Sequence, residues 1–350
     1  MSTKAGEDRF DSTEASPWMR PFVPRRFLSN DHLQTIVGNL LPRTYSLPEP
    51  KTQLIEVETA TSTRGASFVL CHCHWQPAEV RSERLTIVIV HGLEGSSSSP
   101  YVLGNSAHAW TAGCNVVRMN MRCCGAGEQL SPSIYHAGRS EDVAIVMAEL
   151  ADTQLVRSFA LIGYSMGGNV ILKLAGERGG TAPHYLKAVV GVSPLMDLVA
   201  SAAALHEPQN RLYETRFLGE LLKRFRRKIE LYPGLYSADG LNKIRTMRQF
   251  DEQVVARYGG FTDAEDYYRS VASSNWVQDI NVPTLILHAL DDPLIRMTPE
   301  TRSKLLANSH VRLVETRHGG HCAFLSPEPG DAGFWAERTL LDFLLASVEG

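Results

Sequence analysis

The stretch FALIGYSMGGNVILKL, residues 159–174, changes from one kind of local structure to another within a few residues. It begins with a continuous apolar run, which is typical of a strand buried on both faces. Its second half, from Asn169 to Leu174, is compatible with a helix. Between the two halves, Ser165 has Gly163 two residues before it and Gly167 two residues after it, and glycines allow a strained turn with close backbone contacts. The stretch therefore predicts a strand, a tight turn that carries Ser165, and a helix.

The rest of the chain repeats this alternation. Several apolar runs are continuous, such as Ile87–Val90 and Thr284–Leu287, as expected for strands in the middle of a parallel sheet covered by helices. Alternating strands and helices imply right-handed crossovers, and therefore an α/β fold with a mostly parallel central sheet flanked by helices. The predicted strands are Ser67–Trp75, Thr86–Val90, Asn115–Met119, Ser158–Ile162, Leu186–Val192, Thr284–His288 and Val311–Glu315. The predicted helices are Tyr101–Ala112, Arg139–Ala151, Met166–Glu177, Pro299–Ala307 and Phe334–Ser347.

One long stretch interrupts the alternation. Residues 196–278 contain no convincing strand but several amphipathic patterns, and such a length is too great for a simple loop. We therefore predict a helical cap at 196–278, inserted over the carboxyl edge of the sheet. Residues 21–195 and 279–350 then form the core, in which the proline-punctuated segment Pro21–Pro50 is expected to be irregular with one short helix. The polar residues 1–20 are predicted to be a flexible N-terminal tail.

The composition is that of an ordinary soluble globular protein. The 350 residues are 43% hydrophobic and 21% charged, and the net charge of −3 argues against general binding to nucleic acid or anionic lipid. No run approaches the roughly 18 apolar residues that cross a membrane, and the polar N-terminus shows no secretory signal, so we expect a cytoplasmic protein. Six cysteines without the spacing of a disulfide framework are expected to be reduced thiols.

Ser165 is the centre of a G-x-S-x-G motif, and its setting between a strand and a helix is that of a nucleophile elbow. A serine hydroxyl needs a base to remove its proton, and on such a sheet the acid and then the histidine follow beyond late strands. Asp291 and Asp292 both follow one late strand, and a small residue three positions earlier favours Asp292. His318 and His321 both follow the next strand, and the Gly-Gly turn directly before His321 favours it. The predicted catalytic residues are therefore Ser165, Asp292 and His321, with Asp291 and His318 as the alternatives.

An oxyanion hole needs two backbone N–H donors. One is expected at Met166, directly after the nucleophile, where the helix begins and its dipole points toward the developing negative charge. The other is expected in the loop that follows the strand ending at Val90, at Leu93. His91 in the same loop is interpreted as a structural hydrogen-bonding residue and not as a second base.

Further motifs lie in the same order along the chain. They are N-D-H-L-Q-T-I at 30–36, H-G-L-E-G at 91–95, N-M-R-C-C-G at 120–125, Y-H-A-G at 135–138 with Asp142, D-D-P at 291–293 and G-G-H at 319–321. Together with the elbow they resemble the α/β-hydrolase superfamily, and in particular its YheT-like branch of predicted hydrolases or esterases, over roughly residues 20–345. Cys123 departs from the resemblance, because it stands where a glycine is expected.

The resemblance implies an α/β-hydrolase fold and hydrolysis of carboxylic esters with short- to medium-chain or lipid-like acyl groups. In the predicted reaction Ser165 forms an acyl-enzyme while His321 takes its proton and Asp292 orients the imidazole, after which water releases the acid. No metal or organic cofactor is required, and the expected partner is a small-molecule ester. The same triad would also serve an acyltransferase or a thioesterase, and a non-catalytic binding scaffold is the more distant alternative.

Three other features have simpler interpretations. In C-H-C-H at 71–74, the period of two along a strand sends the cysteines to one face and the histidines to the other, so the four cannot surround one metal ion. The vicinal residues Cys123 and Cys124 are interpreted as having a packing or loop role, and redox chemistry is the alternative. A basic group in the predicted cap is interpreted as a solvated helix face, with contact to anionic lipid or acidic substrates as the alternative. That group consists of Arg216, Lys223, Arg224, Arg226, Arg227 and Lys228.

Overall fold

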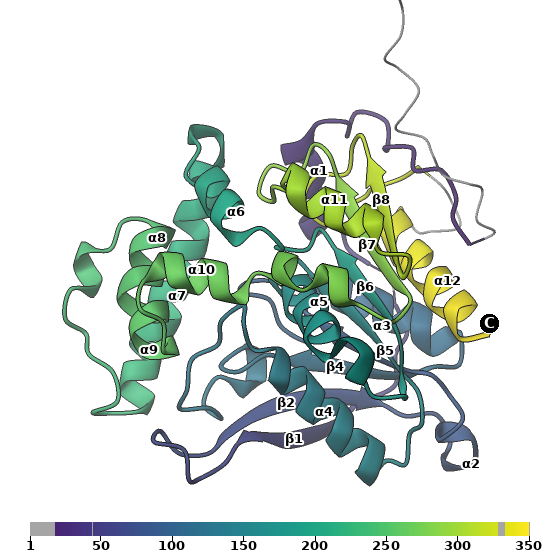
Figure 1. Ribbon diagram of the computed structural model, residues 1–350, viewed down its shortest axis with the longest axis horizontal. Coiled ribbons are helices and arrows are strands. Elements are labelled where there is room, and N and C mark those ends of the chain that lie inside the picture. Colours follow the sequence, from purple (N-terminus) through teal and green to yellow (C-terminus); the bar gives the residue numbers. More distant parts are fainter. Residues whose placement is uncertain (1–17, 44, 328–332, 350) are drawn as a thin grey trace, which may run out of the picture.

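An eight-stranded, mostly parallel sheet forms the centre of the protein in a computed structural model that describes residues 18–43, 45–327 and 333–349 (Figure 1). The strand order is β1-β2-β4-β3-β5-β6-β7-β8. The pair β1–β2 and the pair β2–β4 are antiparallel, and all the other neighbours are parallel. The strands are β1 (Lys51–Glu58), β2 (Ser67–His74), β3 (Thr86–Val90), β4 (Asn115–Asn120), β5 (Phe159–Tyr164), β6 (Leu186–Val192), β7 (Thr284–Ala289) and β8 (Val311–Thr316). The predicted α/β class with a mostly parallel sheet is confirmed.

Helices cover both faces of this sheet (Figure 1). On one face α3 and α12 pack together against β4 and β6, and on the other face lie α4, α5 and α11. Each residue of β3, β4, β5 and β7 is buried, which explains their continuous apolar runs. The helices are α1 (Asp31–Leu40), α2 (Ala78–Arg81), α3 (Pro100–Thr111), α4 (Ser140–Thr153), α5 (Met166–Arg178), α6 (Leu198–Leu205), α7 (Arg211–Leu231), α8 (Met247–Phe250), α9 (Arg257–Gly259), α10 (Ala264–Val271), α11 (Pro299–Ala307) and α12 (Trp335–Glu349).

The strand β1 has no counterpart among the strands expected from the sequence. It lies at the edge of the sheet, pairs with β2 alone, and buries only Ile55 and Val57. A strand so largely exposed has too few apolar positions to give a recognisable alternation, since burial of one face is what creates that pattern. The seven strands predicted from apolar runs all occur. Thr86–Val90 and Leu186–Val192 have the predicted bounds, and the ends of the other five differ by at most two residues.

Between β6 and β7 the chain forms α6 to α10 and no strand, and Figure 1 shows these helices gathered to one side of the sheet. Their own packing is aromatic at the centre. The Phe225 ring on α7 lies 5.5 Å from the ring of Tyr236, 5.7 Å from that of Tyr258 and 6.3 Å from that of Phe250. This segment therefore has a small core of its own beside the sheet.

At the N-terminus, residues 1–17 of the predicted flexible tail lie outside the described residues. The last part of that predicted tail is packed. The Trp18 ring lies 5.2 Å from the Phe343 ring, and the backbone carbonyl of Arg20 accepts a hydrogen bond of 3.1 Å from the Trp335 indole. Trp18 and Arg20 are therefore both held against α12. Of the helices that the structure describes, none has the length and apolar character needed to cross a membrane.

Candidate active site

Ser165 lies between the last residue of β5 and the first residue of α5, and its backbone is in a sparsely populated conformation with φ 53° and ψ −116°. Such a turn brings the surrounding backbone very close. A Cβ atom on Gly167 would lie 2.4 Å from the His91 carbonyl oxygen, and one on Gly163 would lie 2.5 Å from the Gly167 carbonyl oxygen. Both positions therefore accept only glycine, as the spacing around Ser165 predicts.

The loop after β3 lies directly against this turn. A Cβ atom on Gly92 would be 3.2 Å from the Cβ atom of Ser165, and the Gly92 N–H donates a hydrogen bond of 2.9 Å to the Tyr101 hydroxyl. Within the described part of the chain, the backbone N–H groups of Leu93 and Met166 donate to no other group. Leu93 and Met166 line the same cavity as Ser165, and an oxyanion hole would need two such unused N–H donors.

His91 fixes the start of this loop. Burial lowers the pKa of His91 to about 4, so the imidazole is neutral at ordinary pH. Its Nδ1 lies 2.8 Å from the Gly92 carbonyl oxygen, and its Nε2 accepts a hydrogen bond of 3.1 Å from the Met121 N–H. The ring thus joins the loop after β3 to the loop after β4, and both of its nitrogens are used for that purpose.

Asp292 and His321 form a buried pair beyond the carboxyl ends of β7 and β8. His321 Nδ1 lies 2.8 Å from Asp292 Oδ2, and Asp292 Oδ1 accepts hydrogen bonds from the N–H groups of Leu294 and Ile295 at 2.9 and 3.0 Å. Burial acts to lower the pKa of His321, but the Asp292 carboxylate and the Cys322 thiol outweigh it and raise that pKa well above its ordinary value. Burial acts to raise the pKa of Asp292, yet the charge and hydrogen bond of His321 hold it below its ordinary value. The two groups stabilise each other in the charged form.

The alternative residues Asp291 and His318 pair with each other. His318 Nδ1 lies 3.3 Å from Asp291 Oδ2, and Asp291 Oδ1 accepts a hydrogen bond of 2.9 Å from the Gly320 N–H. The His318 side chain is 44% exposed, whereas that of His321 is 13% exposed and lines the same cavity as Ser165. The structure thus brings His321, and not His318, into the same space as the serine.

Ser165 and His321 share this cavity without a direct hydrogen bond between them in the described structure. His321 Nε2 instead lies 3.6 Å from the Cys322 sulfur. Long or missing hydrogen bonds between nucleophile and base are common in enzymes without substrate, and they shorten when the substrate binds. The geometry is therefore compatible with proton transfer from Ser165 to His321 after a small movement of either side chain.

The helix α1 holds the His321 loop from the far end of the chain. The Gln34 side chain donates to the Leu325 carbonyl oxygen at 3.3 Å and accepts from the Leu325 N–H at 2.9 Å. The Thr35 hydroxyl accepts a hydrogen bond of 2.8 Å from the His321 N–H. Sequence analysis singled out the motif at 30–36 without giving these residues a role. The residue types alone carry no signal for it, since the contact joins segments almost 300 residues apart.

Two neighbouring cavities lie near Ser165 and share five lining residues. The first, which we call the catalytic chamber, has a volume of about 120 Å³ and is lined by Ser165 and His321. The second, which we call the inner chamber, has a volume of about 60 Å³ and extends between the core and α7. Both are lined mainly by apolar side chains, as is usual for pockets that take an acyl chain. The residues that line both chambers are Leu93, Met166, Met247, Asp251 and Tyr267.

The C-H-C-H sequence follows the alternation of a strand, as predicted. Cys71 and Cys73 lie in the apolar core, while His72 Nδ1 lies 3.0 Å from the Ser97 hydroxyl and His74 Nε2 accepts a hydrogen bond of 3.2 Å from Arg118. No group of three or more histidine, cysteine or acidic side chains suited to a metal ion occurs among residues 18–43, 45–327 and 333–349.

The basic group on α7 does not form one solvated face, which corrects the simpler interpretation. Arg216, Lys223, Arg226 and Arg227 are exposed, but Arg224 and Lys228 turn inward and line the inner chamber. The Arg224 guanidinium lies 3.0 Å from the Glu94 carboxylate. The spacing gives the physical reason, because position 228 continues the buried stripe of α7 that begins with Leu218, Leu221 and Phe225.

Cys123 adopts φ 62°, in the left-handed region that favours glycine. This agrees with the expectation of glycine at that position. Its sulfur accepts a hydrogen bond of 2.9 Å from the Lys228 ammonium and lies 3.0 Å from the Ser133 carbonyl oxygen. Cys124 is fully buried in the apolar core. In the described structure the two sulfurs thus have separate packing roles.

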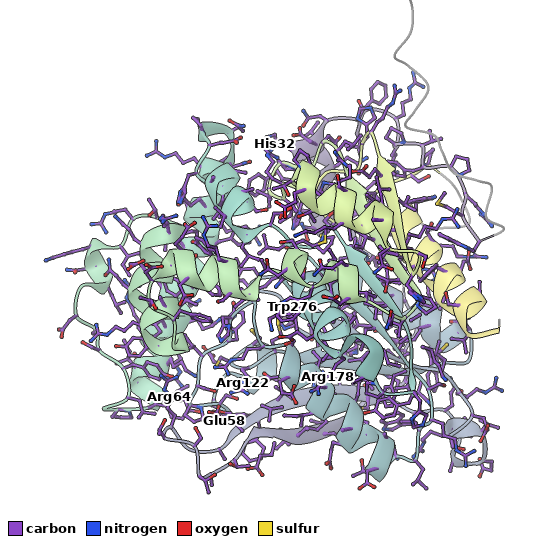
Figure 2. The ribbon with its side chains drawn as sticks, viewed as in Figure 1. His32, Glu58, Arg64, Arg122, Arg178 and Trp276 are labelled. Atoms are coloured by element: carbon purple, nitrogen blue, oxygen red, sulfur yellow. The ribbon has the colours of Figure 1, made fainter. Side chains whose placement is uncertain are left out.

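Next to Cys123, which lines the inner chamber, Arg122 joins β1 to α4. Figure 2 shows Glu58 and Arg122 close together near the end of β1, and Arg122 Nη2 lies 2.6 Å from Asp142 Oδ1. The Arg122 and Asp142 side chains are both about 4% exposed. These residues belong to the motifs that sequence analysis singled out, and their geometry shows a buried ion pair that ties the edge strand to the core.

Comparison with known proteins gives one consistent result. The family model described as the alpha/beta hydrolase fold matches residues 86–328. The "Putative esterase YheT" of Escherichia coli (strain K12) is 32% identical over 332 residues, which cover 94% of this chain and 94% of that protein. The monoacylglycerol lipase of Saccharomyces cerevisiae is 28% identical over 74% of this chain and 58% of its own length. The structure of Est1E from Butyrivibrio proteoclasticus superposes with a TM-score of 0.52 at 14% identity, over 85% of this chain and 99% of that one.

Proposed function

The chain belongs to the α/β-hydrolase family, in its YheT-like branch, and on that premise we propose that it is a serine hydrolase of carboxylic esters. One observation carries the proposal. A strained serine, a carboxylate-paired histidine, and two residues whose backbone N–H groups have no acceptor in the described structure all line one small cavity with mainly apolar walls. These are the groups that acyl transfer requires, and each lies at the end of a core strand or at the start of α5.

In the proposed reaction the Ser165 hydroxyl attacks the ester carbonyl carbon while His321 Nε2 takes its proton. The Asp292 carboxylate holds His321 Nδ1–H and stabilises the imidazolium that forms. The N–H groups of Leu93 and Met166 bind the carbonyl oxygen as it becomes negative. The protonated His321 then gives its proton to the leaving alcohol.

Water completes the cycle. His321, neutral again, removes a proton from a water molecule, whose oxygen attacks the acyl carbon. The bond from that carbon to the Ser165 oxygen then breaks, His321 returns the proton to that oxygen, and the acid leaves. The apolar chamber walls support an ester with a short to medium acyl chain, because the combined volume is small. A relative named as an esterase and another named as a monoacylglycerol lipase also support an ester substrate of this kind.

Labelling with a fluorophosphonate probe tests the proposal. The probe reacts with an activated serine, so we expect the wild-type protein to be labelled and Ser165→Ala to remain unlabelled. The same variant is expected to lose at least about 10⁴-fold in kcat for p-nitrophenyl butyrate, since removal of a nucleophile leaves only binding and oxyanion stabilisation. Its folding should be unchanged by circular dichroism. Equal labelling of both proteins, or none of the wild type, would rule out Ser165 as the nucleophile.

A further inference from the structure

Asp251 lies at the junction of the catalytic chamber and the inner chamber and lines both. Leu93 and Met166 line both chambers as well, and their N–H groups are the proposed donors to the ester carbonyl oxygen. Asp251 therefore lines the same small space as the proposed oxyanion donors. Neither the proposed proton transfers nor the proposed oxyanion hole uses Asp251.

The Asp251 carboxyl group is only partly satisfied by the protein. Its Oδ2 accepts a hydrogen bond of 2.5 Å from the Tyr268 hydroxyl, and its Oδ1 has no hydrogen-bond partner among the residues that the structure describes. Burial raises the pKa of Asp251 to about 7, although the Tyr268 hydrogen bond and the charge of Arg248 act to lower it. Asp251 is half-buried, and its Oδ1 is thus available to accept a hydrogen bond from a donor group of a ligand that enters the chambers.

The backbone at Asp251 is also unusual. It begins η5 (Asp251–Ala256), a π-helical segment that continues α8 and leads into α9. Such segments are rare in proteins and occur often at functional sites, because the extra residue in the turn redirects neighbouring side chains. Here Val254 and Val255 from the same segment form part of the inner chamber wall, so the irregular turn builds the chamber that Asp251 faces.

The charges around the inner chamber indicate what kind of donor fits. Arg224 and Lys228 both line it, and Lys228 is 4% exposed with no carboxylate within 4.0 Å among the described residues. The Arg224 charge is balanced by the Glu94 carboxylate at 3.0 Å, whereas the buried Lys228 ammonium disfavours the entry of a second positive charge. A neutral hydroxyl group is therefore a better donor to Asp251 Oδ1 than an ammonium group.

We propose that Asp251 binds a hydroxyl group of the substrate a few bonds away from the scissile carbonyl, and so selects hydroxylated esters such as partial glycerol esters or hydroxyacyl esters. This inference rests on the proposed hydrolase function and adds the substrate class. Asp251 acts on binding and orientation, and the bond-making steps stay with Ser165 and His321.

Two matched pairs of esters test the proposal. The first pair is 1-monobutyrylglycerol and propyl butyrate, which differ in hydroxyl groups on the alcohol. The second pair is methyl 3-hydroxybutyrate and methyl butyrate, which differ in a hydroxyl group on the acyl chain. Acid release is followed at constant pH, and we expect the wild type to favour the hydroxylated member of at least one pair by roughly 10- to 100-fold in kcat/KM.

Three variants connect this preference to the carboxyl group. In Asp251→Ala the ratio within the favoured pair should fall to about 1, and in Asp251→Asn, which keeps the shape and one acceptor oxygen, it should be intermediate. Asp239→Ala is the matched control, because Asp239 is an exposed aspartate between α7 and α8 that lines neither chamber. Its ratio should equal that of the wild type. The comparison of two esters within one variant removes any effect of a variant on folding.

Two outcomes would overturn the inference. One is a wild-type enzyme that hydrolyses both members of each pair equally, and the other is a preference that survives in Asp251→Ala. Both leave Ser165 labelled by a fluorophosphonate and so leave the hydrolase proposal intact. Failure of the hydrolase proposal is distinct, because it would appear as absence of labelling and of acid release from all four esters.

Discussion

The turn at Ser165 and the helices between β6 and β7 differ in what fixes their residues. Around Ser165 the backbone itself fills the space, so that a Cβ atom on Gly167 would lie 2.4 Å from the His91 carbonyl oxygen. On α7 a Cβ atom on Gly219 would meet no atom within 4 Å. The core therefore fixes the proposed chemistry through backbone geometry, whereas the helices shape the chambers through side chains that can change one at a time. Within one fold, the reaction is rigidly specified and the substrate is adjustable.

The largest effect should come from breaking the buried pair in the core. Asp292→Asn leaves the shape of the loop intact but removes the charge that orients His321, and we expect kcat for p-nitrophenyl butyrate to fall about 10⁴-fold. Asp291→Asn is the matched control, because Asp291 contacts His318 and the Gly320 N–H and does not contact His321. Its rate should stay within about tenfold of the wild type. A larger loss of kcat in Asp291→Asn than in Asp292→Asn would instead assign the role of catalytic acid residue to Asp291.

A pair of glycine substitutions compares the two regions directly. Gly167→Ala places a methyl group against the carbonyl oxygens of Val90 and His91, and we expect it to lower the free energy of unfolding by about 3 kcal/mol. Gly219→Ala lies on an exposed helical turn with free space around it, and should raise the free energy of unfolding by about 0.5–1 kcal/mol. Urea unfolding of both variants measures the difference. Equal effects would contradict the contrast between a backbone-filled core and an open helix.

The smallest expected change is a shift in the pH dependence of kcat/KM, which reports the protonation of His321. The imidazole must be neutral to accept the Ser165 proton, and its neighbours hold its pKa well above the ordinary value of 6.5. We therefore expect kcat/KM to rise with pH, about tenfold per pH unit below that raised pKa, and to level off above it. In Asp292→Asn the raising charge is gone and burial remains, so the inflection should move to lower pH.

The matched control for this pH profile lies in the helical segment. Lys228→Met removes a buried cation that does not contact His321. The kcat/KM of this variant should therefore change with pH around the same inflection point as that of the wild type. The initial rate of p-nitrophenyl ester hydrolysis between pH 5 and about 10 gives both curves. A flat profile for the wild type, or one that falls with rising pH, would contradict the role of His321 as a base.

The contribution of His321 to the free energy of unfolding also depends on pH, but it falls with rising pH whereas the rate rises. A histidine whose pKa is raised in the folded state stabilises that state fully below its unfolded pKa, and the stabilisation is lost as the pH rises through the raised value. The pH at which the proposed base becomes active is thus also the range in which its pair with Asp292 contributes less to stability.

The sequence predicts the core well because backbone geometry and burial restrict which residue types can occupy each position there. Gly163 and Gly167 flank Ser165 for a steric reason, and the continuous apolar runs mark strands that are buried on both faces. The order of Ser165, Asp292 and His321 follows from the order of the strands, and the structure brings the last two to 2.8 Å. Their catalytic roles stay predictions until the variants are measured.

The helical segment is different because its contacts depend on which side chains meet across several helices. Asp251 has no motif around it, and only the folded chain shows that it faces Ser165's cavity. Lys228 is an intermediate case, since its spacing from Phe225 places it on the buried stripe of α7 although its charge suggests solvent. The edge strand β1 escaped detection for a similar reason, because only two of its residues are buried and the pattern is too short to recognise.

The hydrogen bond between Thr35 and His321 spans 286 positions of the chain. A ribosome synthesises α1 long before the His321 loop, so the contacts that Thr35 and Gln34 make with His321 and Leu325 cannot form until that loop has been made. Contacts of such large sequence separation form late, since a long loop must close before they stabilise anything. The loop that carries the proposed base is therefore completed only after α1 has met the segment around Leu325. A chain shortened to a point before His321 would keep the residues of the elbow at Ser165 but would lack the proposed base.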